Sequence, residues 1–536
     1  MDRSLLFFYL FGVFLVLNIS LIVYYVFYHS KIKLTSLPMY FLILSSIYIL
    51  FAQYLKYLSL HFYVDFSHWA TILYNITTSG KSLNLSQEFL YPGTLNYLSA
   101  HFVPMIYVLA IPFKLWTYNE TIIVFNFILM ISAAVPLYKI ALIHYRDKRF
   151  ALFMVTLLLW YPTFQYTILY EFEMLRFSIP IILWMLYFWE KKKMILYFIF
   201  VVLAILVREE VGLTIMMFGL YLIFFEKKHL RGLVTTIMGL GAFILITQIV
   251  IPSLRTTNNY RHIALGTFAS LGSGFSEIIT NIIIHPALVF REICQPFKLA
   301  NIFMFFLPLL FIPLLSPTVL FSSLGNFGVG MLSGSITHCS YMLYYISPSI
   351  PFIFLAFIKG WPRFLTVLKN LMSKWSKDTA TDFGSAAMAM ILSGLLVTNV
   401  FFGPSPISLQ FWFKNIRPAP FKTQNFHYSV YRISEHHRKV EEFCRLIPES
   451  AIVSAQQFLA PQLFKKRGVM VFPKLESLDG TTKADYVFFD KTNNGLNKNS
   501  PAYITQVEFN LIEENKQTWK LIKSEDGYFL YKRIRE

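Results

Sequence analysis

Charge and cysteine are both scarce in this sequence of 536 residues. Only 14% of the residues are charged and 56% are hydrophobic, whereas about 25% are charged in an ordinary soluble domain. This composition excludes a water-soluble globular fold. The three cysteines, Cys294, Cys339 and Cys444, lie far apart without any CxxC pair, so neither a disulfide framework nor a zinc site is indicated.

The motifs of nucleotide chemistry are also missing. No P-loop, GxSxG, HExxH or Rossmann glycine pattern lies where its mechanism would work, which argues against nucleotide-driven transport. The net charge is +18, but Lys and Arg occur in short clusters between apolar runs and not on one basic domain. Such clusters set membrane topology, so we expect a lipid bilayer and no nucleic acid as the partner.

Long apolar runs dominate the sequence instead. Because unpaired backbone groups are costly in hydrocarbon, each run should form a helix, and about 20 residues cross the bilayer core. The first run is too long for a signal-peptide core and has no small-residue cleavage site, so we expect it to be retained. About twelve spans are predicted, near Leu5–Tyr28, Tyr40–Leu60, Ile122–Tyr138, Phe150–Leu169, Phe177–Trp189, Met194–Val207, Val211–Phe225, Gly232–Ile251, Ile302–Leu315, Val319–Met331, Leu343–Ile358 and Gly384–Phe402. The weakly apolar run Val319–Met331 favours a broken or re-entrant helix.

Positive charges between these runs predict the orientation, because cytoplasmic loops are enriched in Lys and Arg. One set of alternate loops is plainly basic and contains Lys31 and Lys33, Arg146 to Arg149, Lys191 to Lys193, Lys227 to Arg231, and Lys359 to Lys377. We expect these loops in the cytoplasm. The opposite loops and the tail after Gly403 are then expected on the outer side.

The composition changes at Pro404, where polar and charged residues return at the frequency of a soluble domain. We therefore expect a mainly α, polytopic transmembrane helical bundle over residues 1–403 and a small extracytoplasmic α/β domain over residues 404–536. Asp526-Gly527 between two apolar runs predicts a β-hairpin. The other elements expected in the tail are strands at Ala451–Ser454, Val469–Phe472 and Tyr486–Asp490 and helices at Glu435–Leu446 and Gln457–Lys465.

Asp65 directly follows a predicted span and opens the outward loop 61–121, in which Phe66–Ile76 has the spacing of an interfacial helix. A partly dehydrated carboxylate can act as a base or be held ionised by a cation. His101, further along the loop, can serve as a base, a metal ligand or a phosphate partner. The alternatives are a helix N-cap for Asp65 and a structural hydrogen bond for His101.

Three charged residues, Arg208, Glu209 and Glu210, interrupt what would otherwise be one apolar tract from Met194 to Phe225. A hairpin tip can be polar without carrying so much charge. We therefore favour a buried or cavity-facing network, with Arg208 as the partner of an anionic phosphate, over a solvated turn.

Glu171 and Glu173 lie between two predicted spans. If the backbone is extended there, both side chains point to one face and can hold a divalent cation such as Mg²⁺ or Mn²⁺. The alternative is a solvated turn with a local ion pair to Arg176. The remaining outward candidates for substrate binding are Arg255, Arg261, His338 and Tyr344. Contacts with lipid headgroups and interfacial aromatic anchoring are the alternatives for these residues.

The order of these features resembles the GT-C superfamily of membrane glycosyltransferases. More specifically, the chain resembles the bacterial membrane family called domain of unknown function 2079. The segments that carry the resemblance are Asp65–Gly80, His101-Phe102-Val103-Pro104 with Pro112, Tyr161–Phe172, Arg208–Gly212, Ser340–Pro351, Ile447–Ser454 and Ala484–Val487. The family pattern leads us to expect a His where this chain has Glu173, which leaves the role of that position open.

The resemblance implies a protein of the bacterial cytoplasmic membrane. It would transfer a sugar from a polyprenyl-phosphate carrier to a glycan, lipid or protein acceptor on the outer side. Asp65 would activate the acceptor hydroxyl or help to hold a metal. Arg208, Arg255 and Arg261 would bind the leaving phosphate.

Two other functions remain open from the sequence. A transporter or lipid-carrier flippase of cell-envelope precursors would place ionisable groups near the bilayer midplane and often shows related halves. Here these groups lie at span ends, and we find no repeat. A non-catalytic membrane assembly protein would act through its tail. The transferase hypothesis instead requires Asp65, His101, Arg208 and His338 to meet at one face.

Overall fold

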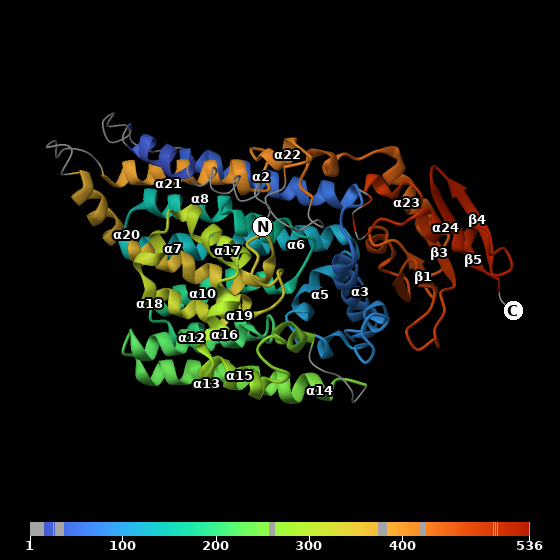
Figure 1. Cartoon of the computed structure of the whole chain (residues 1–536), viewed down its shortest axis with the longest axis horizontal. Helices are drawn as coiled ribbons and strands as arrows, with labels where there is room; N and C mark the ends of the chain where they lie inside the picture. The colour runs from blue at the N-terminus through green and yellow to red at the C-terminus, as the bar shows by residue number, and fades with distance from the viewer. Residues whose placement is uncertain are drawn as a thin grey trace.

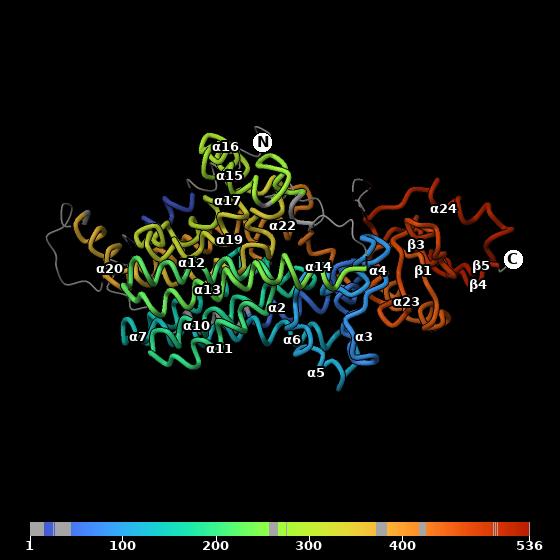
Figure 2. The backbone as a smooth tube through the Cα atoms, turned by 90° about the horizontal axis from the view of Figure 1, so that it is seen from below, coloured from blue at the N-terminus to red at the C-terminus, as the bar shows by residue number. Residues whose placement is uncertain are grey.

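The computed structural model is a bundle of helices with a small sheet domain docked against one end (Figure 1). Most of the longer helices run side by side, and the tail lies at the right-hand end of both backbone views (Figures 1 and 2). The structure describes residues 15–24, 26, 37–256, 263–372, 383–416, 425–496, 498, 500 and 502–534.

Helices make up most of the described residues before the tail, as the composition predicts. The bundle contains α2 (Leu37–Leu58), α6 (Asn119–Ser132), α7 (Ala134–Tyr145), α8 (Lys148–Trp160), α9 (Pro162–Leu169), α10 (Ser178–Glu190), α11 (Met194–Ile205), α12 (Val211–Phe224), α13 (His229–Leu245), α14 (Ile251–Ser253), α17 (Pro296–Phe306), α19 (Leu324–Leu332), α20 (Ile350–Met372) and α21 (Phe383–Phe402). The connecting helices are α3 (Val64–Ser79), α4 (Leu85–Glu88), α5 (Ile106–Leu115), α15 (Phe275–Ile284), α16 (Pro286–Ile293), α18 (Pro317–Leu320) and α22 (Leu409–Trp412). The predicted combination of a helical fold and a small C-terminal sheet is confirmed.

Within the described residues, four helical segments are long and apolar enough to cross a membrane: Asn119–Tyr145, His229–Ser253, Tyr344–Asn370 and Phe383–Phe402. The pair α8 and α9 is bent by 53° and makes a fifth if it forms one span. Other predicted runs form shorter apolar helices, such as α11 and α12. The number of twelve spans therefore stays a prediction. The run Leu5–Tyr28 is described only in part, with a helix at Leu15–Tyr24.

The run Val319–Met331 is helical throughout but irregular. The end of α18, a 3-10 turn at Phe321–Ser323 and α19 follow one another directly. Gly325 allows α19 to approach the backbone of α12 at Leu213, where a side chain would not fit. The 3-10 turn thus lies next to a close helix contact inside the bundle, and a broken or re-entrant span stays a prediction.

Glycines also allow α12 and α13 to pack backbone against backbone. Gly212 and Gly219 on α12 face Gly239 and Gly232 on α13, and a Cβ atom added to Gly239 would lie 2.5 Å from the carbonyl oxygen of Gly212. Small residues at helix contacts are typical of membrane proteins, in which close packing replaces the hydrophobic effect. Because α12 starts directly after Arg208–Glu210, this pair holds the charged turn at the end of the bundle.

The loop 61–121 crosses the bundle end beside the tail. In Figure 1, α3 lies across the ends of the bundle helices, and it buries Phe66 and Trp69 completely or nearly so. The predicted helix at Phe66–Ile76 is confirmed as part of α3. It packs between α5 and the tail, and its place at the membrane interface stays a prediction. The sequence pattern identified its apolar face but not the tail residues that cover it.

The tail folds into a five-stranded mixed sheet with the order β2-β1-β3-β5-β4. Strand β1 is parallel to its neighbours β2 and β3, whereas β5 is antiparallel to its neighbours β3 and β4. The elements are α23 (Glu435–Arg445), β1 (Ile452–Ala455), β2 (Gly468–Val471), β3 (Tyr486–Asp490), α24 (Gln506–Glu513), β4 (Trp519–Glu525) and β5 (Tyr528–Arg533). The hairpin at Asp526-Gly527 is confirmed, with a positive φ at both residues. The helix predicted at Gln457–Lys465 is reduced to a 3-10 turn, because Pro461 has no N–H to donate to a longer helix.

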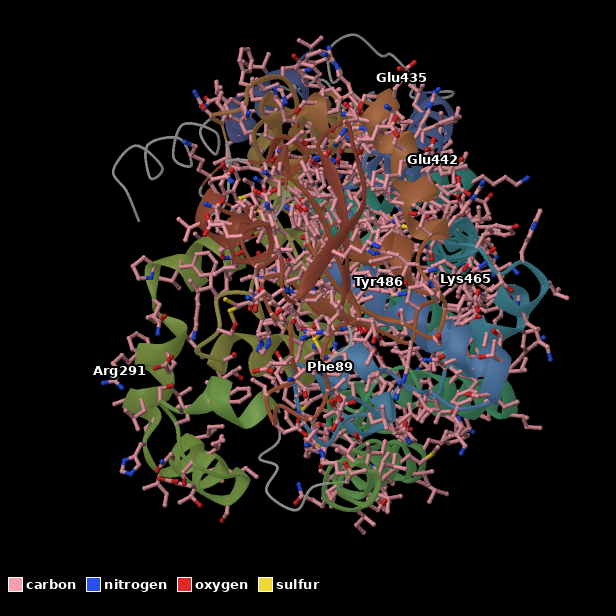
Figure 3. The ribbon with its side chains drawn as sticks, turned by 90° about the vertical axis from the view of Figure 1, so that its right-hand side faces the viewer. Phe89, Arg291, Glu435, Glu442, Lys465 and Tyr486 are labelled. Atoms are coloured by element: carbon pink, nitrogen blue, oxygen red, sulfur yellow. The ribbon has the colours of Figure 1, made fainter. Side chains whose placement is uncertain are left out.

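Hydrogen bonds and apolar contacts fix the tail to the bundle. Asn494 Nδ2 donates to the carbonyl oxygens of Ser59 at 3.0 Å and Leu60 at 3.1 Å. Ser67 Oγ on α3 donates to a tail carbonyl at 3.0 Å. Phe89, seen below Tyr486 in Figure 3, belongs to the same apolar cluster as residues of β2 and β3. The tail is therefore held against the end of the bundle by both kinds of contact.

The described basic segments after α7, α10 and α12 and in α20 lie at the end of the bundle opposite to the tail (Figure 1). Lys359 Nζ on α20 is 2.9 Å from Glu226 Oε1, which follows α12. The Tyr145 hydroxyl at the end of α7 donates to the carbonyl oxygen of Ile358 at 2.7 Å. The two sets of loops thus lie at two ends of the bundle. Which end faces the cytoplasm stays a prediction.

Alanine at Gly239 is expected to lower the melting temperature of the detergent-purified protein, because its Cβ atom would collide with the backbone of α12. Overpacking of this kind costs about 1–3 kcal/mol. Gly241 on the same helix is the matched control, since a Cβ atom there meets nothing within 4 Å. Equal melting temperatures for Gly239→Ala and Gly241→Ala would contradict this packing of α12 against α13.

Candidate active site

Asp65 lies in the first turn of α3, at the bundle end beside the tail. The N-cap of this helix is Tyr63, and no side chain of the cap bonds to the first turn. The Asp65 carboxylate instead accepts a hydrogen bond on Oδ2 from the hydroxyl of Tyr170. Asp65 is therefore held by a distant segment and does not serve as the N-cap.

Glu171 covers the N-terminus of α3. Its Oε2 accepts a hydrogen bond from the backbone N–H of Phe66 at 3.3 Å. Burial and then the negative charge of Asp65 raise the pKa of Glu171 to about 8, against the opposing effects of the helix N–H groups and Lys56. The Glu171 carboxyl is therefore largely protonated at neutral pH.

A buried network surrounds Arg208. Its Nε lies 3.0 Å from Glu210 Oε2, and its Nη1 lies 3.5 Å from Glu173 Oε1. Its Nη2 is 3.1 Å from His101 Nε2, while His101 Nδ1 is 2.7 Å from Glu209 Oε1. Since an arginine can only donate, these partners assign the proton of a neutral His101 to Nδ1. Only 6% of the Arg208 side chain is exposed, so the predicted charged network is present and buried.

The carboxylates around Arg208 differ in their charge state. Burial works to raise the pKa of Glu209, but the electrostatic interaction and hydrogen bond with His101 and the charge of Arg208 outweigh it and lower the pKa to about 2. Burial raises the pKa of Glu173 and of Glu210 despite the nearby arginine. Glu209 therefore stays ionised at neutral pH and orients His101. The raised pKa of Glu173 and Glu210 makes these two carboxyls easier to protonate.

Aromatic rings connect Tyr170 to His338. The ring centroids of Tyr170 and Tyr344 are 5.0 Å apart, and Tyr344 stacks on Tyr345 at 4.4 Å. The imidazole of His338 lies 4.5 Å from the Tyr345 ring. Burial lowers the pKa of His338 to about 4, so its imidazole is neutral at neutral pH. These rings form one wall of the bundle end that carries Asp65.

Most of the predicted site residues come together at this end. They are Asp65, His101, Glu171, Glu173, Arg208, Glu209, Glu210, His338 and Tyr344. Arg255 follows α14, which contacts the 3-10 turn Tyr97–Ser99 close to His101. Arg261 lies outside the described residues. The roles of these residues in binding or catalysis stay predictions.

The two carboxylates expected to share a cation face different partners. Glu171 points to the start of α3, whereas Glu173 Oε1 accepts from the backbone N–H of Met174 at 3.0 Å and faces Arg208. In this arrangement they do not provide a joint pair of ligands. The described part of the chain also contains no group of three or more His, Cys, Asp and Glu side chains placed to hold a metal ion. A requirement for Mg²⁺ or Mn²⁺ stays a prediction.

Arg176 positions the segment that carries Tyr170. This arginine is fully buried, and its Nη1 donates to Asn126 Oδ1 at 3.2 Å and to the carbonyl oxygens of Ile168 and Tyr170 at 3.4 Å. The sequence suggested only a local ion pair for it. A charge between two apolar runs, the signal that identified Arg208, also marks Arg176.

A cavity of about 210 Å³ opens beside Asp65. Both the bundle and the tail line it, with Lys56, His61, Tyr63, Val64, Asp65, Tyr170 and Glu171 from the bundle side and Gln457, Ser500 and Ala502 from the tail. The three tail residues carry no motif that sequence reasoning could have used. Their part in the cavity follows only from the docking of the tail.

The helical bundle, with the site at one of its ends and a small C-terminal sheet domain docked there, defines a membrane protein with several apolar helices. The chain belongs to the family described as predicted membrane protein (DUF2079), whose family model matches residues 64–530. The family expected from the sequence is thereby confirmed.

Two solved structures of ArnT from Cupriavidus metallidurans are similar to this chain. The structure bound to undecaprenyl phosphate has 12% sequence identity and a TM-score of 0.48, and the apo structure has 12% identity and a TM-score of 0.45. Each comparison covers 90% of this chain and 97% of the ArnT chain. No curated protein matches the sequence.

Replacing Glu171 with Gln is expected to flatten the pH dependence of thermal stability. The folded-state pKa of about 8 lies above the ordinary value of 4.5, so the folded protein keeps a proton that the unfolded chain loses. The stabilisation is full below pH 4.5 and is lost as the pH rises through about 8. The melting temperature of the wild type should therefore fall more steeply over this window than that of Glu171→Gln.

The exposed Glu441→Gln variant is the control for this experiment, since Glu441 forms only a surface ion pair with Arg445. It should follow the wild-type profile. Coinciding profiles for Glu171→Gln and the wild type would contradict the raised pKa.

Proposed function

We propose that this protein is a membrane glycosyltransferase that moves a sugar from a polyprenyl-phosphate carrier to an acceptor on the extracytoplasmic side. The observation that carries the proposal is the half-buried Asp65 carboxylate, which Tyr170 holds at a cavity beside the Arg208 network. Transfer from a lipid phosphate needs a base for the acceptor and a cation for the leaving group. Both groups are found at one end of a membrane bundle. The order of the sequence motifs supports the same class.

Asp65 acts as the general base in this proposal. The acceptor hydroxyl gives its proton to the Asp65 carboxylate while its oxygen forms a bond to the anomeric carbon of the donor sugar. The bond between that carbon and the phosphate oxygen breaks, and its electron pair leaves with the polyprenyl phosphate. Attack from the side opposite to the leaving group inverts the anomeric configuration. The Tyr170 hydroxyl orients the carboxylate throughout.

Arg208 stabilises the negative charge that develops on the leaving phosphate. It is already paired with carboxylates, so a phosphate must replace one of them. The contact with Glu173 is the longer of its two ion pairs, at 3.5 Å, and the pKa of Glu173 is raised by burial. A protonated Glu173 would release Nη1 of Arg208 to a phosphate oxygen. The lasting anion Glu209 keeps His101 beside the arginine during this exchange.

An apolar groove of about 270 Å³ provides a place for the carrier lipid. Met105, Phe125, Met174, Phe177 and Trp184 are among the residues that line it. Its residue Met174 directly follows Glu173, so part of the groove lies beside the turn that carries this partner of Arg208. A prenyl chain in the groove would bring its phosphate to the charged end of the bundle.

Asp65→Asn is expected to reduce transfer from a polyprenyl-phosphate sugar by about 10²–10⁴-fold, because the amide cannot take up the acceptor proton. The measurement is the rate of sugar transfer by the purified full chain in lipid vesicles, together with complementation of a glycan-dependent phenotype. Asp479→Asn, in an exposed turn of the tail, is the matched control and should retain the wild-type rate. Full transfer by a normally inserted Asp65→Asn protein would remove the proposed mechanism.

A further inference from the structure

The cavity beside Asp65 belongs to both parts of the molecule. Its roof consists of Gln457, Ser500 and Ala502 from the tail. Gln457 follows strand β1, and the other two residues follow strand β3, which is the parallel neighbour of β1. Ligands of open α/β sheets bind outside the carboxyl ends of the parallel strands. The roof of the cavity comes from this edge of the tail sheet.

The roof is held in a fixed position. Gln456, which precedes Gln457, is fully buried and exchanges two hydrogen bonds with the backbone of Asp490: its Nε2 donates at 3.0 Å and its Oε1 accepts at 2.6 Å. Asn494, just after β3, anchors the same region to the end of α2 through Ser59. Gln457 is therefore presented to the cavity from a backbone that both domains constrain.

The charged groups around the cavity balance one another. Lys56 is the basic group of the lining and Asp65 and Glu171 are its acidic groups, but the raised pKa of Glu171, about 8, leaves that carboxyl largely protonated. Burial lowers the pKa of His61 to about 3, so its imidazole is neutral. The three tail residues that line the cavity bring an amide, a hydroxyl and a methyl group, and none of them is charged. The lining of the cavity therefore has no net charge that would attract a charged ligand.

The size and the lining of the cavity suit a single ring. Its volume of about 210 Å³ lies below the roughly 300–1,000 Å³ of sites for drug-sized ligands. Val64, Tyr63 and Ala502 offer apolar surface for the C–H face of a sugar. Gln457 and Ser500 offer hydrogen-bond donors and acceptors for its hydroxyl groups.

We infer, building on the proposed function, that this cavity receives the acceptor as one uncharged, hydroxyl-bearing sugar ring, and that Gln457 of the tail selects it. The Gln457 amide can donate to one hydroxyl and accept from another, while Asp65 faces the hydroxyl that reacts. A site that hydrogen-bonds hydroxyl groups strongly rejects analogues that lack them, because its own polar groups are then left unpaired. The tail is therefore part of the acceptor site.

Binding can be measured without transfer. The purified full chain in detergent is heated with the neutral methyl glycosides of glucose, galactose and mannose, and separately with glucuronate and glucose 6-phosphate. At least one neutral glycoside should raise the melting temperature in a concentration-dependent way, because a ligand that binds only the folded state stabilises it. The two charged sugars should not raise it.

The variants test whether the ligand lies under Gln457. Gln457→Trp should fill the cavity and abolish the stabilisation, and the gentler Gln457→Ala should weaken binding by about tenfold, which corresponds to about 1.4 kcal/mol. Gln506→Trp and Gln506→Ala on the exposed face of α24 are the matched controls and should bind like the wild type. Asp65→Asn should also bind the glycoside, although its rate of sugar transfer is strongly reduced.

The outcomes separate this inference from the proposed function. Stabilisation by the charged sugars as strong as by the neutral ones, no stabilisation by any neutral glycoside, or unchanged binding in both Gln457 variants would overturn the inference. Glycoside binding that depends on Gln457, in a wild-type protein that transfers no sugar, would uphold the cavity and overturn the proposed function.

Discussion

The burial of Arg208 at the bundle end beside the tail is the constraint on which the site depends. A cation removed from water needs close partners, and losing one partner of a buried pair costs about 3–5 kcal/mol. Arg208 meets this need with Glu173 and Glu210 and through His101, which Glu209 orients in turn. These contacts tie the loop 61–121, the turn after α9 and the turn after α11 together. The polar end of the bundle is thereby organised around one guanidinium group.

The turn from Tyr170 to Glu173 lies between two cavities with different linings. On one side, Tyr170 and Glu171 line the polar cavity under the tail. On the other side, Met174 continues the same segment into the apolar groove. Arg176 holds this segment through buried hydrogen bonds to Asn126 and to the carbonyl oxygens of Ile168 and Tyr170. In the proposed function, the acceptor and the carrier lipid would therefore occupy two different cavities beside the same turn of the chain.

Apolar periodicity and charge placement were enough to predict the helical bundle, the tail strands and the charged network at Arg208–Glu210. They could not predict which distant segments meet. The partnership of Asp65 with Tyr170 has no sequence signal, since a tyrosine at a span end is also typical of an interfacial anchor. The position of Gln457 in the cavity lining depends on how the tail docks, and no local sequence pattern predicts that docking. The bounds of individual helices also differ from the predicted apolar runs, because irregular helical turns depend on contacts such as that of Gly325 with α12.

In the proposed function, the carrier phosphate reaches the Arg208 end of the bundle. This can be measured by photocrosslinking of the full chain in lipid vesicles with a polyprenyl phosphate that carries a diazirine next to the phosphate, followed by mass spectrometry of the labelled peptides. We expect labels in the segments 99–105, 170–177 and 205–211, with competition by unlabelled polyprenyl phosphate. Labels concentrated at the opposite end, around Glu226 and Lys359, would contradict it.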